Sequence, residues 1–236
     1  MPTGKTLAKA SLQERIRQTL EQAFQDGHLK PGMPIDEHAL ARQFKASRTP
    51  VREALLLLVA KGLIEIVPRS GIYVRQLDVR ELVATMEGLS ELEGVLARLA
   101  ALRIGAAQSA RLNKALARTA TCAQTQNKER YAQANADLHD IIYEASGNAC
   151  IVEQTRLLRL RIAPYRGKLF EQPGRLVRSH AEHERVVHAI CRGDCEGAAE
   201  AMRQHILAGG KALTDMVLCA PAANPGGYRK TRRRQD

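Results

Sequence analysis

Tryptophan is absent from this chain of 236 residues, and aromatic residues make up only 3% of it. Aromatic and β-branched residues favour strands, whereas the alanine and leucine that abound here favour helices. The composition therefore predicts a mainly α-helical protein and argues against a large sheet. The length is sufficient for one large domain or two small ones with a buried core.

Long apolar runs are also missing, because none approaches the roughly 18–20 residues that a membrane-spanning helix needs. The N-terminus lacks the apolar segment of a signal peptide. The five cysteines form an odd set without the spacing of a disulfide framework, and Cys191 and Cys195 have no second pair with which to form a zinc knuckle. We expect a cytoplasmic protein with reduced thiols and no membrane partner.

Positive charge is concentrated at the two ends of the chain. Residues 1–75 carry 12 Lys and Arg against 7 Asp and Glu, and residues 220–236 carry 5 against 1. The middle, residues 76–219, is nearly balanced with 19 against 17. This distribution predicts an anionic partner for the N-terminal third and a ligand-binding or dimerisation role for the middle.

The N-terminal third has the order of elements of a winged helix-turn-helix. After a flexible start (1–10), helical periods cover residues 11–27, a short stretch after Asp36, and a third stretch that ends at Gly62. Two short β-type runs follow, and Pro68-Arg69-Ser70-Gly71 separates them as a hairpin turn. We predict a DNA-binding domain over residues 11–76.

The third of these helices carries the DNA-reading residues that we predict. Thr49 is a plausible N-cap, with Pro50 in the first helical position. Arg48 and Arg52 are four residues apart, so both can reach base edges in the major groove, where guanine is their natural partner. Ser47 and Thr49 are placed to contact phosphates near the helix N-terminus.

In the wing, Arg69 and Gly71 are predicted to approach the DNA backbone or the minor groove. Downstream, residues 77–219 show six helical stretches with short breaks, which predicts an all-α bundle. These stretches are 81–102, 108–126, 128–145, 149–170 with Pro164 inside, 175–192 and 195–218. Residues 220–236, rich in alanine and proline and then in arginine, are typical of a disordered basic tail.

Histidines are the main resource for a metal site in the bundle. His183 and His188 are five residues apart and therefore diverge on a helix, which excludes the HExxH pattern of zinc proteases. Asn135 and His139 share a helix face, and His183 and His205 lie on two later helices. Convergence of these four residues suits zinc, nickel or a similar divalent ion, but from the residues alone a set of core or solvated histidines is favoured over a metal site.

The pattern as a whole resembles a known family of regulators. Residues 11–75 resemble the DNA-binding domain of GntR-family transcriptional regulators in the segments Gly27–Gly32, Leu40-Ala41, Ser47–Leu55, Gly62-Leu63-Ile64 and Gly71. Residues 78–218 resemble the FCD domain of the FadR subfamily in the segments Glu91-Leu92-Glu93, Ala97–Ala101, Asn135–His139, Glu144–Asn148, Glu182-His183, Ala189-Ile190, Gly193-Asp194, Ala198, Met202 and His205.

The FCD resemblance implies a ligand set and an effector. Metal-binding members use an Asp or Asn and three histidines, matching Asn135, His139, His183 and His205, and commonly bind a small organic acid beside the metal. Two departures stand out: Leu138 replaces a usual aromatic, and Leu89 lies near the position where many members have an arginine for the effector carboxylate. Several arginines cluster in residues 149–170, and guanidinium groups fit planar anions, so we predict effector binding by Arg161 and Arg166, and by His180, three residues before His183.

Together these features predict a homodimeric, ligand-responsive transcriptional regulator, a repressor by family habit and not an enzyme. Two winged-helix heads would bind a palindromic operator in double-stranded DNA, and a small carboxylate metabolite would modulate that binding. Two alternatives stay open. A metal-dependent hydrolase could use the same Asn and His cluster, and a constitutive DNA-binding protein would need no effector.

Overall fold

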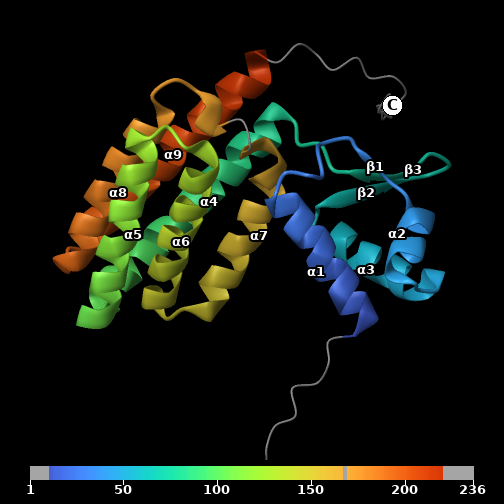
Figure 1. Cartoon of the computed structure of the whole chain (residues 1–236), viewed down its shortest axis with the longest axis horizontal. Coiled ribbons are helices and arrows are strands. Elements are labelled where there is room, and N and C mark those ends of the chain that lie inside the picture. The colour runs from blue at the N-terminus through green and yellow to red at the C-terminus, as the bar shows by residue number, and fades with distance from the viewer. Residues whose placement is uncertain (1–10, 167–168, 220–236) are drawn as a thin grey trace, which may run out of the picture.

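The computed structural model of the chain describes residues 11–166 and 169–219. A smaller N-terminal half, with helices and a sheet, lies beside a larger half that is helical throughout (Figure 1). This order confirms the predicted fold class, a winged helix-turn-helix followed by an all-α bundle. The predicted flexible start (1–10) and basic tail (220–236) lie outside the described residues.

The N-terminal half contains three helices, and an N-cap residue precedes each of them. The helices are α1 (Leu12–Gln25), α2 (Glu37–Phe44) and α3 (Arg48–Ala60). Ser11 caps α1 by accepting the amide of Glu14, and Asp36 caps α2 by accepting two amides. The apolar faces of these helices form one core, whose fully buried members include Ile16, Phe24, Val51, Leu55 and Leu58.

The start of α3 differs from the prediction. Ser47, not Thr49, is the N-cap, and Pro50 is the third residue of the helix. The first turn of a helix leaves its N–H groups without helical partners, so proline is tolerated there as well as at the first position. Because Pro50 offers no N–H at the usual capping position, the Ser47 side chain makes no capping hydrogen bond.

A small antiparallel sheet closes this half. Its strands, β1 (Pro34–Ile35), β2 (Ile64–Val67) and β3 (Gly71–Val74), lie in the order β1-β3-β2. The hairpin of β2 and β3 is the predicted wing, with Val67 opposite Gly71. Strand β1 is missing from the sequence prediction because its two residues lie in a connector rich in proline and glycine, and only pairing with β3 makes them a strand.

The second half is a bundle of long helices close to the predicted stretches. They are α4 (Val79–Arg103), α5 (Ala106–Gln124), α6 (Lys128–Ser146), α7 (Ala149–Arg166), α8 (Arg175–Cys191) and α9 (Cys195–Cys219). Helix α7 ends at Arg166, earlier than predicted, and a short 3-10 turn at Leu169–Glu171 follows. Pro164 lacks an N–H and crowds the preceding turn, which weakens the helix near its end.

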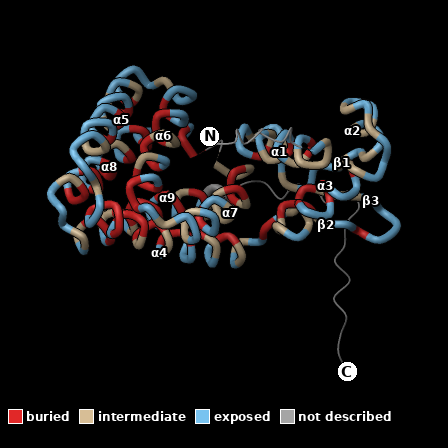
Figure 2. The backbone as a smooth tube through the Cα atoms, turned by 90° about the horizontal axis from the view of Figure 1, so that it is seen from below, coloured by how far each residue is buried: buried red, intermediate tan, exposed pale blue. Residues whose placement is uncertain are grey.

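The two halves have separate apolar cores that meet at α7. Most of the buried stretches in the second half lie on α4, α8 and α9, which line its interior (Figure 2). Leu160 of α7, by contrast, is buried in the core of the N-terminal half. Nearby, Arg161 Nε donates a hydrogen bond to the carbonyl of Lys61 at 2.9 Å, and Tyr165 accepts the amide of Leu77 at 2.7 Å. Helix α7 therefore belongs to the bundle and contacts the winged helix directly.

Across the described ranges, none of the helices combines the length and apolar character needed to traverse a lipid bilayer.

Candidate functional site

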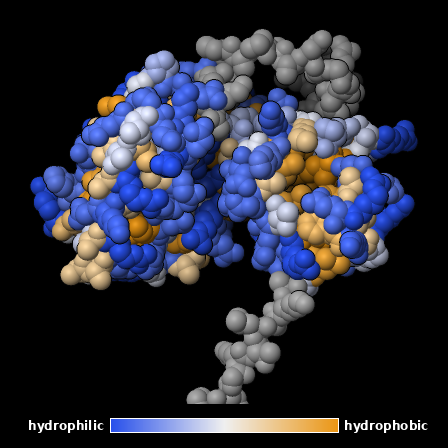
Figure 3. All heavy atoms as spheres, in the orientation of Figure 1, coloured by the Kyte–Doolittle hydropathy of each residue, from blue (hydrophilic) through white to orange (hydrophobic). Residues whose placement is uncertain are grey.

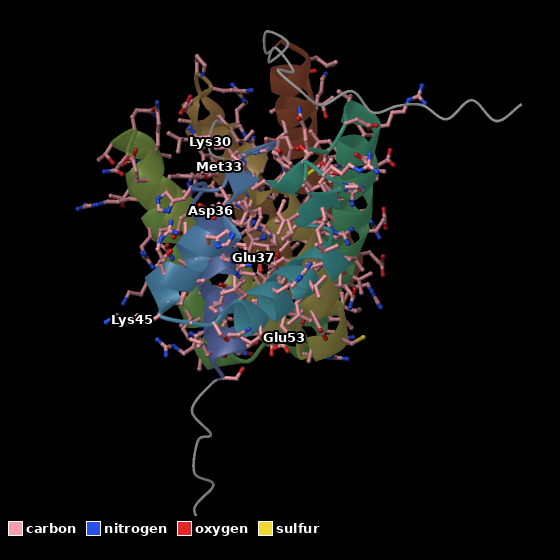
Figure 4. The ribbon with its side chains drawn as sticks, turned by 90° about the vertical axis from the view of Figure 1, so that its right-hand side faces the viewer. Lys30, Met33, Asp36, Glu37, Lys45 and Glu53 are labelled. Atoms are coloured by element: carbon pink, nitrogen blue, oxygen red, sulfur yellow. The ribbon has the colours of Figure 1, made fainter. Side chains whose placement is uncertain are left out.

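The first candidate surface is the exposed side of α3 and its surroundings. Arg48, Thr49 and Arg52 are exposed, as is Glu53, while Val51 and Ala54 on the opposite side are fully buried. Glu53 lies on α3 beside α2, whose N-cap is Asp36, whose first residue is Glu37 and whose C-cap is Lys45 (Figure 4). The burial pattern thus fixes α3 by its apolar side and leaves its two arginines free to contact another molecule.

This surface also has an apolar component. In the space-filling view the half that contains α1–α3 shows a broader apolar area than the bundle does (Figure 3). Leu56, Leu57 and Ile66 are the large apolar residues of α3 and β2 that remain exposed. A surface that mixes arginine with apolar side chains can read base edges and thymine methyl groups as well as phosphates.

The tip of the wing is held in a defined shape. Arg69 has a φ of 65°, the left-handed region, and is exposed between β2 and β3. The Ser70 and Tyr73 hydroxyls lie 2.9 Å apart, and Tyr73 also donates to the carbonyl of Ser70. Gly71 has a φ of 138°, which other residues rarely adopt. The predicted wing residues therefore lie on one short, cross-braced turn; Ser70 and Tyr73, which brace it, were not predicted.

The second candidate site lies inside the bundle. His139 of α6, His183 of α8 and His205 of α9 are buried, and their candidate ligand atoms lie within 4.8 Å of one another. The Nε2 atoms of His139 and His183 are 3.3 Å apart. Asn135, one turn before His139, is 3% exposed and lines the same space. The structure therefore brings together all four residues of the predicted ligand set.

Two buried carboxylates orient these histidines. Glu93 Oε2 lies 2.8 Å from His139 Nδ1, and Glu182 Oε2 lies 2.8 Å from His205 Nδ1. Burial opposes ionisation of Glu93, but Arg159 and His139 hold its pKa well below its ordinary value. A carboxylate only accepts hydrogen bonds, so Nδ1 of His205 carries the proton and its Nε2 keeps a free lone pair. Nδ1 of His139 lies 2.8 Å from both the Glu93 carboxylate and Arg159 Nη2. This arrangement is typical of the outer shell of a metal site.

The histidines are neutral in this environment. Burial, followed by the charge of Arg159, lowers the pKa of His139 to about 3. Burial also lowers the pKa of His183 well below its ordinary value, with His205 and His139 contributing. Neutral imidazoles are the form that binds metals, and three lone pairs so close together favour a shared cation. Asn135 Nδ2 and His183 Nδ1 are buried without hydrogen-bond partners. The donor set of three imidazoles and one amide therefore fits a divalent ion such as zinc or nickel.

A cavity extends from the histidine cluster toward the C-terminal end of α7. Its polar lining comprises Asn135, His139, Arg159, Arg166, Arg175, Ser179 and His205, and its apolar lining comprises Met86, Leu89, Ile162, Leu169, Phe170, Ile206 and Leu213. Arg159 contacts Glu93 at 2.6 Å, and Arg175 forms a two-pronged contact with Glu182. Burial and the neighbouring Arg159 lower the pKa of Arg166 to about 10, which still leaves it charged at neutral pH.

The predicted effector residues divide into one inside the cavity and two outside it. Arg166 lines the cavity. Arg161 does not, because its guanidinium binds the carbonyl of Lys61 in the N-terminal half. His180 also turns away, with Nδ1 2.8 Å from Thr119 Oγ1 of α5. At about 100° per residue, His180 lies about 60° around α8 from His183, and Arg161 lies about 160° around α7 from Arg159.

Sequence reasoning missed the roles of Glu93, Arg159, Arg175 and Glu182. Arg159 of α7, for which the sequence analysis predicts no role, is held against buried Glu93. Helical spacing contained a signal for Glu93, which lies four residues after Leu89 and three before Leu96 on the apolar stripe of α4. A charged residue in such a stripe needs a buried partner, but the sequence does not say which one.

Comparisons with known proteins agree with this architecture. The family described as bacterial regulatory proteins, gntR family, matches residues 12–74, and the FCD domain matches residues 85–208. The chain is 28% identical over 206 residues to a "probable D-xylose utilization operon transcriptional repressor" of Paenarthrobacter nicotinovorans, spanning 87% of this chain and 90% of that protein. It is 29% identical to the HTH-type transcriptional regulator McbR of Escherichia coli K12, spanning 87% of this chain and 96% of McbR.

Solved structures give the same result. The structure of E. coli McbR/YncC superimposes with a TM-score of 0.77 at 25% identity and covers 89% of this chain and 100% of that one. The relatives named here are transcriptional regulators. Because the FCD match spans more than half of the chain and follows a matching winged helix, the chain belongs to the gntR family of bacterial regulatory proteins and carries an FCD domain.

Proposed function

We propose that this regulator is a homodimeric, cytoplasmic repressor whose binding to a palindromic operator is modulated by a small organic acid. Residues 11–76 form the DNA-binding half, and residues 77–219 form the effector-binding and dimerisation half. Two relatives named as repressors support the sign of the regulation. Two-fold symmetry of a dimer would impose a two-fold operator with half-sites spaced by about one helical turn.

In the DNA-binding half, Arg48 and Arg52 contact base edges. Both are exposed at the N-terminal end of α3, as a recognition helix in the major groove requires. Ser47 and Thr49 bind phosphates at the start of the helix, and Arg69 of the wing approaches the backbone or minor groove, with Gly71 shaping the turn. Each arginine that forms a two-pronged contact with guanine contributes about 1–3 kcal/mol of discrimination.

The observation that carries the regulatory part is the cavity beside the buried histidine cluster. A bundle that served only to dimerise would not need seven polar residues around an internal space. Asn135, His139, His183 and His205 would hold a divalent ion, zinc or nickel by donor type. Such an ion would supply a positive charge that attracts the carboxylate of a ligand.

Helix α7 offers a route between the two sites. Three consecutive residues point to different partners: Arg159 binds Glu93 beside His139, Leu160 lies in the core of the winged helix, and Arg161 binds the carbonyl of Lys61. A ligand that draws on Arg159 or Arg166 therefore shifts the same helix on which the winged helix packs. It changes operator affinity to the extent that it binds the two arrangements differently.

The test is operator binding with and without organic acids. Fluorescence anisotropy on DNA from upstream of the gene should give a specific complex that Arg52→Ala weakens, because that variant removes a base contact. Zinc-loaded protein should then lose affinity in the presence of at least one acid from a panel. Operator affinity that no acid changes would favour the constitutive alternative. Turnover of an acid by the metal-loaded protein would favour the hydrolase, although the two carboxylates beside the cluster, Glu93 and Glu182, are already paired with arginine and histidine.

A further inference from the structure

The side chains that line the cavity are both polar and apolar, and their mixture indicates what the cavity binds. We propose that the ligand is a short monocarboxylate with an apolar body, and that Arg166 holds its carboxylate. This inference rests on the proposed function, since it names the class of the effector. The ligand class follows from the charge of the cavity lining, its unpartnered donors, its apolar walls and its size.

Among the described residues that line the cavity, Arg166 is the one cation without a carboxylate partner. Arg159 is neutralised by Glu93 and Arg175 by Glu182, both through contacts of 2.6 to 2.9 Å. Arg166 has no carboxylate within ion-pairing distance among the residues that the structure describes. A half-buried guanidinium without a counter-charge favours an anion, and one such group matches one carboxylate.

Three further polar groups that line the cavity are buried and lack hydrogen-bond partners. Asn135 Nδ2, Arg175 Nε and Ser179 Oγ make no hydrogen bond, although their residues are 3%, 4% and 1% exposed. All three residues line the cavity. Buried donors are rarely left unsatisfied, so they indicate a missing acceptor. The two oxygens of a carboxylate can accept from these groups and from Arg166 together.

Apart from His139, Arg159 and His205, the remaining side chains around the ligand body are apolar. Met86, Leu89, Leu169, Phe170, Ile206 and Leu213 surround it, all at most 8% exposed. A hydroxyl or second carboxylate placed against these side chains would lose its water without gaining a partner. The walls therefore select against sugar acids and dicarboxylates and favour a hydrocarbon body.

The size of the cavity narrows the class of ligand further. The space open to the centre of a water molecule is about 40 Å³. A single water needs roughly 10–15 Å³ on this measure. The cavity thus admits a body of a few carbon atoms unless its walls move, which matches propionate or butyrate better than a long acyl chain.

Isothermal titration calorimetry with sodium butyrate tests this inference. Sodium glycerate and sodium malonate, which are close in size, serve as the hydroxylated and doubly charged comparisons. The titrations use chelator-treated full-length protein and are repeated with zinc, so that chelation by glycerate is recognised. We expect butyrate to bind about 10- to 100-fold more tightly than either comparison, the range that an unpartnered buried polar or charged group produces.

Two variants locate the anion. Arg166→Met should weaken butyrate binding by about 10- to 100-fold, whereas Arg185→Met, on the exposed side of α8, should leave it unchanged. Arg166→Lys, which keeps the charge, should restore part of the loss and shows that the effect is not unfolding. Equal binding by Arg166→Met and wild type, or tighter binding of glycerate or malonate than of butyrate, would overturn the proposal.

The result is separable from the regulatory proposal. Butyrate binding through Arg166 without any change in operator affinity would support this inference and contradict the proposed function. Release of the operator by another acid, with no binding of butyrate, would contradict this inference and support the proposed function.

Discussion

The two candidate sites use arginine in opposite ways. Arg48 and Arg52 of α3 extend from the surface, and nothing but the helix positions them. Arg159 and Arg175 of the bundle lie against Glu93 and Glu182, each of which also binds a histidine. The exposed pair is free to bind DNA phosphates and bases, whereas the buried pair is held in place and shapes a cavity. We propose that the same type of side chain serves DNA recognition in one half and preorganisation of a cavity in the other.

Breaking the buried pair should have the largest effect. Glu93→Gln removes the charge that Arg159 faces at 2.6 Å in a fully buried position. Since removing one partner of a buried ion pair leaves the other uncompensated, we expect a loss of about 3–5 kcal/mol in the free energy of unfolding. Urea unfolding followed by circular dichroism measures it.

The matched control is Glu91→Gln, two residues earlier on α4, which contacts Arg203 at 3.0 Å and is 66% exposed in its side chain. Exposed pairs contribute about 1 kcal/mol or less. Similar losses for the two variants would mean that the buried network does not stabilise the bundle.

Zinc binding should raise the free energy of unfolding of the bundle and not that of the N-terminal half. Zinc at about 100 times its dissociation constant should raise the free energy of unfolding by about 2.7 kcal/mol through binding to the folded state. His183→Ala should abolish that gain, and His188→Ala, exposed on the same helix, should not. The readouts are thermal unfolding and metal content by elemental analysis. A stoichiometric metal retained by a variant that lacks both His139 and His183 would place the site elsewhere.

Substitution of the exposed arginines of α3 should change operator affinity and leave stability unchanged. Arg52→Ala should weaken operator binding by about 1–3 kcal/mol and reduce the preference for the specific site. Stability should be unchanged, because Arg52 is exposed. Arg185→Ala, in the bundle, is the matched control and should bind the operator as the wild type does. Anisotropy titrations on specific and unrelated DNA measure both, and an unaltered affinity of Arg52→Ala would exclude α3 as the recognition helix.

The sequence predicted the folded halves well because their signals are local. Apolar periods, caps and glycine stops gave the helices within a few residues, and the hairpin turn gave the wing. Strand β1 was missed because only its pairing with β3 makes it a strand. The early end of α7 was missed because it depends on how strongly Pro164 weakens the helix. The predicted four-residue ligand set also came together, but this prediction depended on family resemblance more than on spacing.

What the sequence did not supply is the identity of partners across the bundle. Arg161 and Arg159 are two residues apart, yet one contacts the winged helix and the other contacts buried Glu93. Neither residue type nor period distinguishes them, since both flank an apolar stripe. The direction of each depends on how α7 packs between the two halves, which is a property of the tertiary fold.

The central claim is that the bundle controls the exposed arginines through α7. The most direct test is the operator dissociation constant of wild type and Arg161→Ala, each with and without saturating sodium butyrate. The account predicts that butyrate changes the wild-type value by about fivefold or more, the lower end of ordinary coupling. It predicts a factor near one for Arg161→Ala, with butyrate affinity unchanged by calorimetry. An equal response of the two proteins would contradict the account.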